Sequence, residues 1–399
     1  MTDDSEPSEP YGMHRQVEVY TAGMMAGTPP DYPVSYERLR ERAEAVLDPE
    51  AYAYVAGGAG AEETVRSNRT AFERWKLVPR MLRDVSERDL SVELFGRTLP
   101  VPVLLAPIGV QSIVHDDAEL ATARAADSLD VPFVLSTASS ETMEDVAAAA
   151  GEVPRWFQLY WSGDKELTAS LIERAEAAGY DALVVTLDTP LLGWRERDVE
   201  QAYLPFLDAE GVANYFSDPA FRDALDDPPE EDPDAAVMHF VDVFTNAEAT
   251  WDDLAVVQEA TDLPVVLKGI LHPADARLAV EHGVDGVVVS NHGGRQVDGA
   301  LGALDSLPGV VAAVEGEIPV LFDSGVRRGA DAVKAIALGA DAVMLGRPYA
   351  YGLALGGEEG VRAVLKNFLA DLDLTLALSG HTSFDDLEAS ELVETTGRR

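Results

Sequence analysis

The chain has 399 residues, of which 47% are hydrophobic, so it can bury a full core in one large domain or two small ones. No stretch approaches the roughly 20 apolar residues of a membrane span, and the N-terminal MTDDSEPSEP is acidic rather than signal-like, so we expect a cytoplasmic protein without a membrane span. Cysteine is absent, which excludes disulfides and cysteine-based catalytic or metal sites, and no metal site is predicted.

The charge of the chain is strongly unbalanced. It has 71 acidic residues against 30 basic ones and a net charge of −41. Such a surface repels nucleic acid and anionic lipid, so neither is an expected partner. Lysine is scarce, which is typical of a halophilic protein in a high-salt cytosol, because salt shortens the screening length to roughly 3 Å at 1 M. The alternative is an ordinary acidic protein.

The first part of the chain, residues 1–100, is predicted to be an N-terminal helical extension packed on the remainder of the protein. Residues 36–47 and 50–55 are expected to form helices that close the base or rim of a barrel. Residues 90–99 are expected to form a small hairpin around Gly96.

From residue 101 onward, short apolar runs alternate with Ala-rich amphipathic segments. The runs are VPVLLAPI (from Val101), PFVLST (from Pro132), RWFQLY (from Arg155), ALVVTLD (from Ala182), VVLKG (from Val265), GVVVSN (from Gly286), VLFDSG (from Val320) and AVMLGR (from Ala342). Runs that are apolar on both faces suit parallel strands covered by helices. Eight of them in roughly 250 residues predict an α/β fold, a (β/α)₈ TIM barrel over residues 101–375, rather than an open doubly wound sheet. Residues 376–399 are expected to form a C-terminal tail.

The segments between the runs carry helix signals. Ser139 and Ser140 are N-cap candidates for ETMEDVAAAA, and KELTASLIERAEAAG and ADAVKAIALGA each contain a terminating glycine. The connection after the fourth run is far longer than the others and includes DDPPEEDPDAA from Asp226. Its proline and charge density favour a mobile excursion. We interpret the insertion, about residues 196–250, as a lid over the catalytic face; the alternative is a solvated, salt-adapted insertion without a role.

Polar residues follow the predicted strands where barrel enzymes carry out their chemistry. The first six strands are followed by Pro107, Ile108 and Gly109; Ser136; Gln158 and Tyr160; Thr186, Asp188 and Arg195; Lys268; and Ser290, His292 and Arg295. After the last two strands, Gly325, Gly346 and Arg347 are candidates for a phosphate cradle, with Asp323 and Arg327 beside it. This arrangement predicts a phosphate-bearing cofactor next to a reactive centre.

His292 and the two arginines at this rim suggest a specific chemistry. Asp188 can hold the His292 imidazole in one tautomer, which suits a general base. Arg195 and Arg295 can fix a carboxylate by charge-assisted hydrogen bonds. A base beside such a clamp favours proton removal from a small 2-hydroxy acid.

These residues stand in motifs that resemble the FMN-dependent L-2-hydroxy acid oxidising family, the family of glycolate oxidase and L-lactate dehydrogenase. The resemblance covers about residues 17–369 and is carried by YVAGGAG, LAPIG, FQLY, TLDTP, LKGI, SNHGGRQ, DSGVR and LGRP in the family's order. Within the family the likeness is greatest to lactate 2-monooxygenase, on cues such as Gly109, where many family oxidases have alanine, and Trp194, which precedes the substrate arginine. Ala138 stands where glycolate oxidase has a tryptophan.

The resemblance implies a role for each rim residue. His292 is the base and Asp188 its partner; with Lys268, against the flavin, and Tyr160 they make up the catalytic set. Arg195 and Arg295 bind the substrate carboxylate, and Tyr54 and Tyr160 contact the substrate. The residues implied in FMN binding are Pro107, Ile108, Gly109, Ser136, Gln158, Thr186, Lys268, Ser290, Asp323, Gly325, Arg327, Gly346 and Arg347.

The implied reaction is FMN-dependent oxidation of an L-2-hydroxy acid, with L-lactate and O₂ as the expected substrates. Lactate 2-monooxygenase activity, giving acetate, CO₂ and water, is the first expectation. An L-lactate oxidase or dehydrogenase that gives pyruvate is the alternative, and a non-redox flavin barrel such as type 2 isopentenyl diphosphate isomerase is the alternative from another class. Relatives assemble as tetramers or octamers, so the resemblance also implies a homotetramer or homo-octamer.

Overall fold

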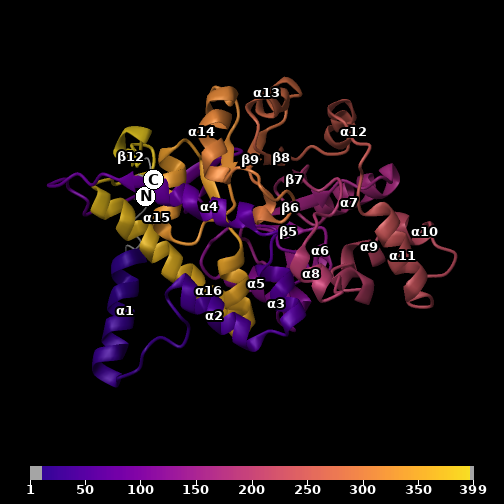
Figure 1. Cartoon of the computed structure of the whole chain (residues 1–399), viewed down its shortest axis with the longest axis horizontal. Coiled ribbons are helices and arrows are strands. Elements are labelled where there is room, and N and C mark those ends of the chain that lie inside the picture. The colour runs from indigo at the N-terminus through magenta and orange to yellow at the C-terminus, as the bar shows by residue number, and fades with distance from the viewer. Residues whose placement is uncertain (1–10, 396–399) are drawn as a thin grey trace, which may run out of the picture.

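A closed barrel of eight parallel strands forms the body of the protein in the computed structural model, which describes residues 11–395 (Figure 1). The barrel closes where β11 pairs with β4. The strands are β4 (Val103–Leu105), β5 (Phe133–Ser136), β6 (Arg155–Tyr160), β7 (Leu183–Thr186), β8 (Val265–Ile270), β9 (Gly286–Val289), β10 (Val320–Phe322) and β11 (Ala342–Leu345). Every strand lies in the apolar run predicted for it, except that β8 extends by one residue, so the predicted TIM barrel is confirmed.

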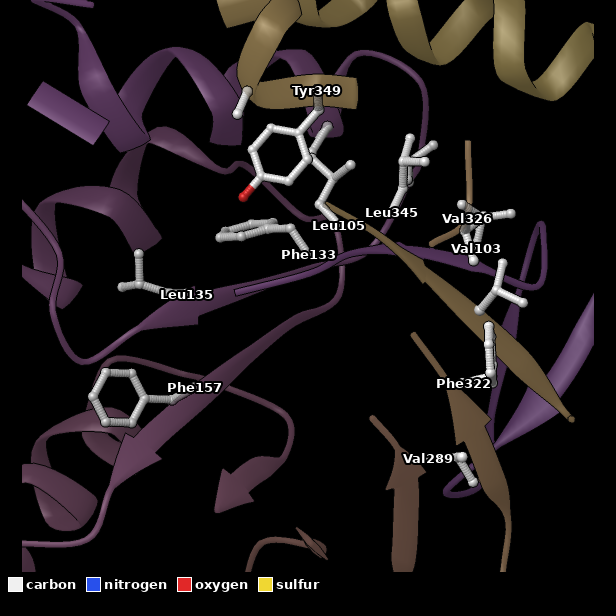
Figure 2. Close-up of a cluster of buried hydrophobic side chains, with 14 of the residues drawn as sticks. Val103, Leu105, Phe133, Leu135, Phe157, Val289, Phe322, Val326, Leu345 and Tyr349 are labelled. Carbon is white, nitrogen blue, oxygen red and sulfur yellow. The ribbon is translucent and has the colours of Figure 1, made fainter. Parts of the chain in front are cut away.

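Helices cover the outside of the barrel. They are α5 (Ala118–Asp127), α6 (Met143–Ala149), α7 (Lys165–Ala177), α12 (Leu254–Glu259), α13 (Pro273–Glu281), α14 (Ala303–Val314), α15 (Gly329–Ala337) and α16 (Arg347–Ser379). Figure 2 shows the layer beneath them, in which alternate strand residues such as Leu105, Phe133 and Phe157 point outward. Tyr349 from α16 packs on this layer and donates its hydroxyl to Ala106 O at 2.8 Å, so a buried polar group keeps a partner.

The other face of each strand fills the barrel interior. A separate apolar cluster there includes Leu104, Trp156, Val266 and Met344. The predicted hairpin, β2 (Val92–Leu94) and β3 (Arg97–Leu99), adds Leu94 and Leu99 to this cluster. Phe95 of this hairpin lies 5.4 Å from Trp156, the second residue of β6, and packs against Gly286, the first residue of β9, so the hairpin closes the amino-terminal end of the barrel. The site must therefore form at the other end.

The N-terminal extension consists of α1 (Tyr11–Ala26), α2 (Tyr36–Val46), α3 (Pro49–Ala56), α4 (Glu63–Arg74) and β1 (Trp75–Leu77). Helices α2 and α3 match the predicted ones, whereas α1 and α4 were not predicted. Helix α16 continues to Ser379, beyond the boundary expected at residue 375, and β12 (Leu392–Glu394) pairs with β1. The end of the chain is therefore joined to the extension. The segment MTDDSEPSEP and residues 396–399 lie outside the described residues.

The insertion after β7 is largely helical. It contains α8 (Glu196–Glu200), α9 (Ala213–Phe216), α10 (Pro219–Asp223) and α11 (Pro233–Val243). Aromatic rings hold it together: Tyr215 and Phe240 lie 4.8 Å apart and Phe240 and Phe244 4.9 Å apart, centroid to centroid. The second half of DDPPEEDPDAA, predicted as a mobile excursion, is instead the start of α11, where the Asp232 side chain accepts from Ala235 N at 3.0 Å. Proline at the first helical position suits this start.

One predicted helix cap is wrong. Thr142, not Ser139 or Ser140, caps α6 and accepts a hydrogen bond from Asp145 N at 3.2 Å. Ser140 instead bonds Ser112 N at 3.1 Å, across to the loop after β4. Between residues 11 and 395, no helix is both long and apolar enough to span a bilayer.

Candidate active site

A cavity opens at the carboxyl end of the barrel. Its atom-free space is about 1200 Å³, part of which is open solvent. Most of the predicted site residues line it: Tyr54, Pro107, Ile108, Gly109, Tyr160, Arg195, Lys268, His292, Arg295, Asp323, Gly325, Arg327, Gly346 and Arg347. Tyr36 of α2 and Tyr54 of α3 bring the N-terminal extension into the same wall. The insertion contributes Phe206 and Phe244, so it faces the cavity as a lid would.

The floor of the cavity is a layer of polar side chains directly above the apolar interior. Strand alternation places one polar residue on the inner face at the end of each of six strands: Ser136, Gln158, Thr186, Lys268, Ser290 and Asp323. Ser136 Oγ donates to Gln158 Oε1 at 3.0 Å, and Lys268 Nζ donates to Ser290 Oγ at 3.1 Å. Thr186 does not line this cavity and instead borders a second one, beside Trp161 and Trp251. Ser136, Gln158 and Ser290 lie behind the lining residues.

Two features of this floor indicate that it binds a polar ligand. The Gln158 Nε2 group is buried and has no hydrogen-bond partner among the described residues. Lys268 is buried 3.6 Å from Asp323. Burial lowers the pKa of Lys268, but the carboxylates of Asp323 and Asp188 outweigh it and raise the pKa, so the ammonium stays charged. An unsatisfied donor and a fixed cation suit the carbonyl- and nitrogen-rich ring of a flavin.

The turn that carries His292 depends on its own sequence. Ser290 Oγ accepts from His292 N at 3.0 Å, and Asn291 Oδ1 accepts from Gly294 N at 3.0 Å. Gly293 and Gly294 have φ of 65° and 78°, and a Cβ on them would lie 2.9 Å from Arg347 Nη1 and 2.8 Å from Val65 N. Glycine is therefore required at both positions. The motif SNHGG is a turn that aims one imidazole into the cavity.

Asp188 holds the His292 ring. Asp188 Oδ1 lies 2.9 Å from His292 Nδ1, which leaves Nε2 as the free ring nitrogen. Burial lowers the pKa of His292; Asp188 opposes this and Lys268 adds to it. Burial would raise the pKa of Asp188, yet His292 and Lys268 hold it below its usual value. The pair is a neutral imidazole oriented by a carboxylate, which is the form of a general base.

Two arginines flank this base without acidic partners. Arg195 Nη2 donates to Gln296 Oε1 at 3.2 Å and its Nε to Arg295 O at 3.3 Å, while Arg295 Nη1 donates to the carbonyls of Tyr54 and Gly57. Neither lies within 4.0 Å of a carboxylate of the described residues. Burial, with Arg195 nearby, lowers the pKa of Arg295 to about 9. Two neighbouring guanidinium groups without a counter-charge provide a place for one anion.

The opposite end of the cavity has the features of a phosphate site. Helix α16 begins at Arg347, and its N-cap residue Gly346 supplies no side-chain cap. Pro348 has no N–H and Tyr349 N donates to Gly346 O, which leaves the N–H groups of Gly346 and Arg347 without a partner among the described residues. Arg327 lies over the Tyr36 ring at 4.2 Å. Arg347 lies at the same helix start, and its three guanidinium nitrogens donate to Val55 O, Gly293 O and Gly57 O at 3.0, 2.9 and 2.7 Å. These bonds tie the end of α3 to the His292 turn, and the part of Arg347 in phosphate binding stays a prediction.

Several residues at the site were not predicted from the sequence. Gln296 Nε2 donates to Asp188 O at 2.7 Å while its Oε1 accepts from Arg195, so it links the base to the clamp. Ser324 Oγ accepts from Asn291 N and Gly293 N at 3.2 and 3.0 Å. Asp198 is buried near both arginines with Oδ1 unpartnered. Gln296 and Ser324 could have been found from their places in SNHGGRQ and DSGVR, whereas no sequence signal marks Asp198.

Comparison with known proteins agrees with this geometry. The family model for FMN-dependent dehydrogenases matches residues 43–394. An L-lactate oxidase of Lysinibacillus sphaericus is 45% identical over 92% of this chain and 94% of its own length. Human 2-hydroxyacid oxidase 1 is 43% identical over 85% of this chain and 91% of its own length. A crystal structure of mandelate oxidase superposes with a TM-score of 0.81 at 40% identity and covers 92% of this chain and 100% of its own.

These matches span nearly the whole chain, and they leave the isomerase alternative without support. An FMN site also fits the polar floor, the unpartnered Gln158 donor and the uncapped helix end. The chain belongs to the FMN-dependent α-hydroxy acid dehydrogenase family and is an FMN-dependent α-hydroxy acid oxidoreductase.

Proposed function

We propose that the protein oxidises a small L-2-hydroxy acid, with L-lactate as the first candidate, and passes the electrons to O₂ as an oxidase. The observation that carries the substrate class is the unpaired pair Arg195 and Arg295 beside His292. In a 2-hydroxy carboxylate the α-carbon is bonded directly to the carboxylate carbon and carries the hydroxyl. A group held by the arginines is therefore within reach of the imidazole.

Each side chain has a defined task in this proposal. Arg195 and Arg295 bind and orient the carboxylate, and Tyr54, with both guanidinium groups near its ring, and Tyr160 contact the rest of the substrate. His292 Nε2 accepts the proton, and Asp188 stabilises the imidazolium that results. Burial raises the pKa of Tyr160, so its phenol stays protonated and can donate a hydrogen bond.

FMN supplies the acceptor for two electrons when it is bound. Ser136, Gln158, Thr186, Ser290 and Lys268 would hold its ring, where the Lys268 ammonium would lie against it as a positive charge. Asp323, Gly325, Arg327 and the start of α16 at Gly346 would hold the ribityl chain and phosphate. Pro107, Ile108 and Gly109 would form the adjoining wall. Arg347, at the same helix start, would also contribute to phosphate binding, and its bonds hold the end of α3 against the His292 turn.

An oxidase outcome has better support than the monooxygenase expected from sequence cues. The names of the relatives include L-lactate oxidase and 2-hydroxyacid oxidase. Trp194, one of the monooxygenase cues, is 68% exposed and does not line the cavity. Gly109 does line it, but packing alone accounts for it, because a Cβ there would lie 2.5 Å from Ala138 O.

Product analysis tests the proposal. The purified, FMN-loaded protein is incubated aerobically with L-lactate in molar KCl, and O₂, pyruvate, acetate and H₂O₂ are measured. An oxidase gives one pyruvate and one H₂O₂ per O₂. Acetate and CO₂ that still form when catalase removes peroxide would instead establish the monooxygenase, because H₂O₂ itself converts pyruvate to acetate and CO₂. Reduction of a dye without O₂ uptake would establish a dehydrogenase. Failure of glycolate, L-lactate and L-mandelate alike to bleach the flavin would overturn the substrate class.

A further inference from the structure

The part of the cavity wall formed by residues 107–109 packs so closely against its neighbours that it has no space to move. These residues follow β4 and all three line the cavity. A Cβ on Gly109 would lie 2.5 Å from Ala138 O and 3.1 Å from Ser136 Oγ. Any shift of this segment therefore changes the shape of the cavity or collides with the loop after β5.

The next residue turns the chain away in a strained conformation. Val110 is buried and has φ 58° and ψ 41°, in the left-handed region that β-branched residues avoid. Two hydrogen bonds donated by backbone N–H groups hold this turn. Val110 N donates to Ala138 O at 2.8 Å, and Gln111 N donates to Glu119 Oε1 at 3.1 Å. The strained turn persists because these two hydrogen bonds fix it, and one of their acceptors is the carboxylate of Glu119.

Glu119 lies on α5 and is 2% exposed. It forms no ion pair with a described cation, and its Oε2 has no hydrogen-bond partner. The Gln111 side chain extends the link to the wall, because Nε2 donates to Ile108 O at 2.9 Å and Oε1 accepts from Thr122 of α5 at 2.6 Å. A carboxylate behind the cavity is thus two hydrogen bonds away from a residue that lines it.

We propose that Glu119 is a positioning residue that holds the cavity wall at residues 107–109 through Gln111, and that its charge state sets how firmly the wall is held. A carboxylate accepts the Gln111 N–H more strongly than a neutral carboxyl does. Glu119 has no role in the oxidation mechanism itself. The inference rests on the FMN site, not on the identity of the hydroxy acid.

The surroundings of Glu119 place its titration near neutrality. Burial raises the pKa of Glu119 to about 7, although the N–H groups of Gln111 and Ser140 oppose the shift; Glu141 raises it further. The Tyr349 hydroxyl faces Glu119 from α16, and Glu210 of the insertion reaches the same turn through Ser112. Neither group is a cation, and no cation is among the described groups that shift the pKa of Glu119.

Two substitutions test the proposal. Glu119→Leu removes the acceptor, and Glu119→Gln keeps a neutral acceptor in its place. Asp127→Leu is the matched control, because Asp127 lies on the same helix and accepts a backbone N–H from Glu152, at 3.2 Å, in a loop that does not line the cavity. The readouts are the FMN dissociation constant of the apoprotein, from quenching of flavin fluorescence, and the visible spectrum of the bound flavin, at pH 6 and pH 8.

The wild-type protein should bind FMN more tightly at pH 8 than at pH 6. The ratio of the FMN dissociation constants at the two pH values should be smaller in Glu119→Gln than in the wild type, because only the contribution of the FMN phosphate, which itself titrates at about pH 6, remains. Glu119→Leu should bind FMN at least tenfold more weakly than the wild type at both pH values, and Asp127→Leu should match the wild type. If Glu119→Leu does not fold, the reduced pH response of Glu119→Gln decides alone. A wild-type response in Glu119→Gln, or wild-type affinity and spectrum in Glu119→Leu, would overturn the proposal. Since no readout uses a hydroxy acid, these results do not depend on the proposed substrate.

Discussion

The His292 imidazole is kept neutral by its position rather than by its sequence neighbours. Burial and the Lys268 ammonium lower its pKa, and they outweigh the attraction of Asp188. The same Lys268 lowers the pKa of Asp188. One cation thus favours a charged carboxylate and an uncharged imidazole at once, which is the combination that a base with a fixed tautomer needs.

Replacing the base should separate binding from chemistry. His292→Ala should bind FMN normally, because His292 is not part of the polar floor, but should reduce the flavin about 10²–10⁴-fold more slowly with L-lactate. Stopped-flow absorbance measures the rate. His282→Ala is the control, since His282 stacks on Trp251 at 5.5 Å and does not line the cavity. A near-normal rate in His292→Ala would refute the assignment of the base.

Removing the charge of Asp188 should move the pH profile. Protonated His292 cannot accept a proton, so the rate of flavin reduction falls as the pH drops through the His292 pKa, which lies below the ordinary 6.5. Asp188→Asn removes the attraction that raises this pKa, so the acid limb should shift to lower pH. The maximal rate should fall about 10²-fold, because the imidazolium loses its counter-charge.

Asp198→Asn provides the comparison for this profile. Asp198 is a buried acid near the same arginines, but it does not contact His292. The acid limb of the Asp198→Asn variant should therefore stay at the wild-type pH. An unshifted limb in Asp188→Asn would show that another group controls the profile.

Much of the site could be predicted at the scale of the residue, because strand ends meet at one rim. The positions of Gln158 and Lys268 near the ends of β6 and β8 were enough to place them at this rim. The hydrogen bonds of Arg347 to the carbonyls of Val55 and Gly57, at the end of α3, could not be predicted, since only the fold brings these carbonyls beside it. Glu119 is a further case, because nothing in the sequence near it shows that its carboxylate faces Gln111 N.

At the scale of elements, the barrel strands were predictable and the insertion was not. The strands are continuous apolar runs, because both faces are buried. The helices of the insertion are short, from 4 residues in α9 to 11 in α11, and polar on one side. Their stability comes from an aromatic cluster that includes residues such as Phe206. These contacts join positions far apart in the chain, so the local sequence pattern does not reveal them. Helix α4 was missed for a similar reason: its N-cap position, Glu62, is left-handed and offers no capping signal.

Two phenylalanines of the insertion should have different effects on specificity. Phe244 lines the cavity and lies 5.0 Å from Tyr160, whereas Phe240 packs behind it and does not reach the cavity. Phe244→Ala and Phe240→Ala should each destabilise the fold by about 3–5 kcal/mol. Only Phe244→Ala enlarges the cavity, so only this variant should have a lower ratio of the KM for a hydroxy acid with a longer side chain, such as L-2-hydroxyhexanoate, to the KM for L-lactate.

Steady-state kinetics with the two acids, alongside thermal denaturation, measures this difference. Phe240→Ala controls for the general effect of a loosened insertion. An equal change of preference in both variants would mean that the cluster acts as a whole. In that case Phe244 would not form the part of the wall that limits substrate size.

At the scale of the whole molecule, the net charge of −41 acts against both folding and substrate binding. Like charges spread over the surface repel one another in the compact state, and they also repel an anionic hydroxy acid. Salt screens these exposed charges over roughly 10 Å at 0.1 M and roughly 3 Å at 1 M. The clamp of Arg195 and Arg295 acts at contact distance inside the cavity, so it is screened much less. We therefore expect salt to help the fold and to leave substrate recognition intact.

The midpoint of thermal denaturation should rise on the order of 10 °C between 0.1 M and 2 M KCl, because several kcal/mol of surface repulsion is removed. Circular dichroism follows the transition, and the KM for L-lactate should fall, not rise, over the same range. Sucrose is the control, since it strengthens apolar burial without screening charge. If sucrose at equal osmolality reproduced the whole shift, or if the midpoint did not change with KCl, repulsion between carboxylates would not limit stability. The acidic surface would then be no adaptation to salt.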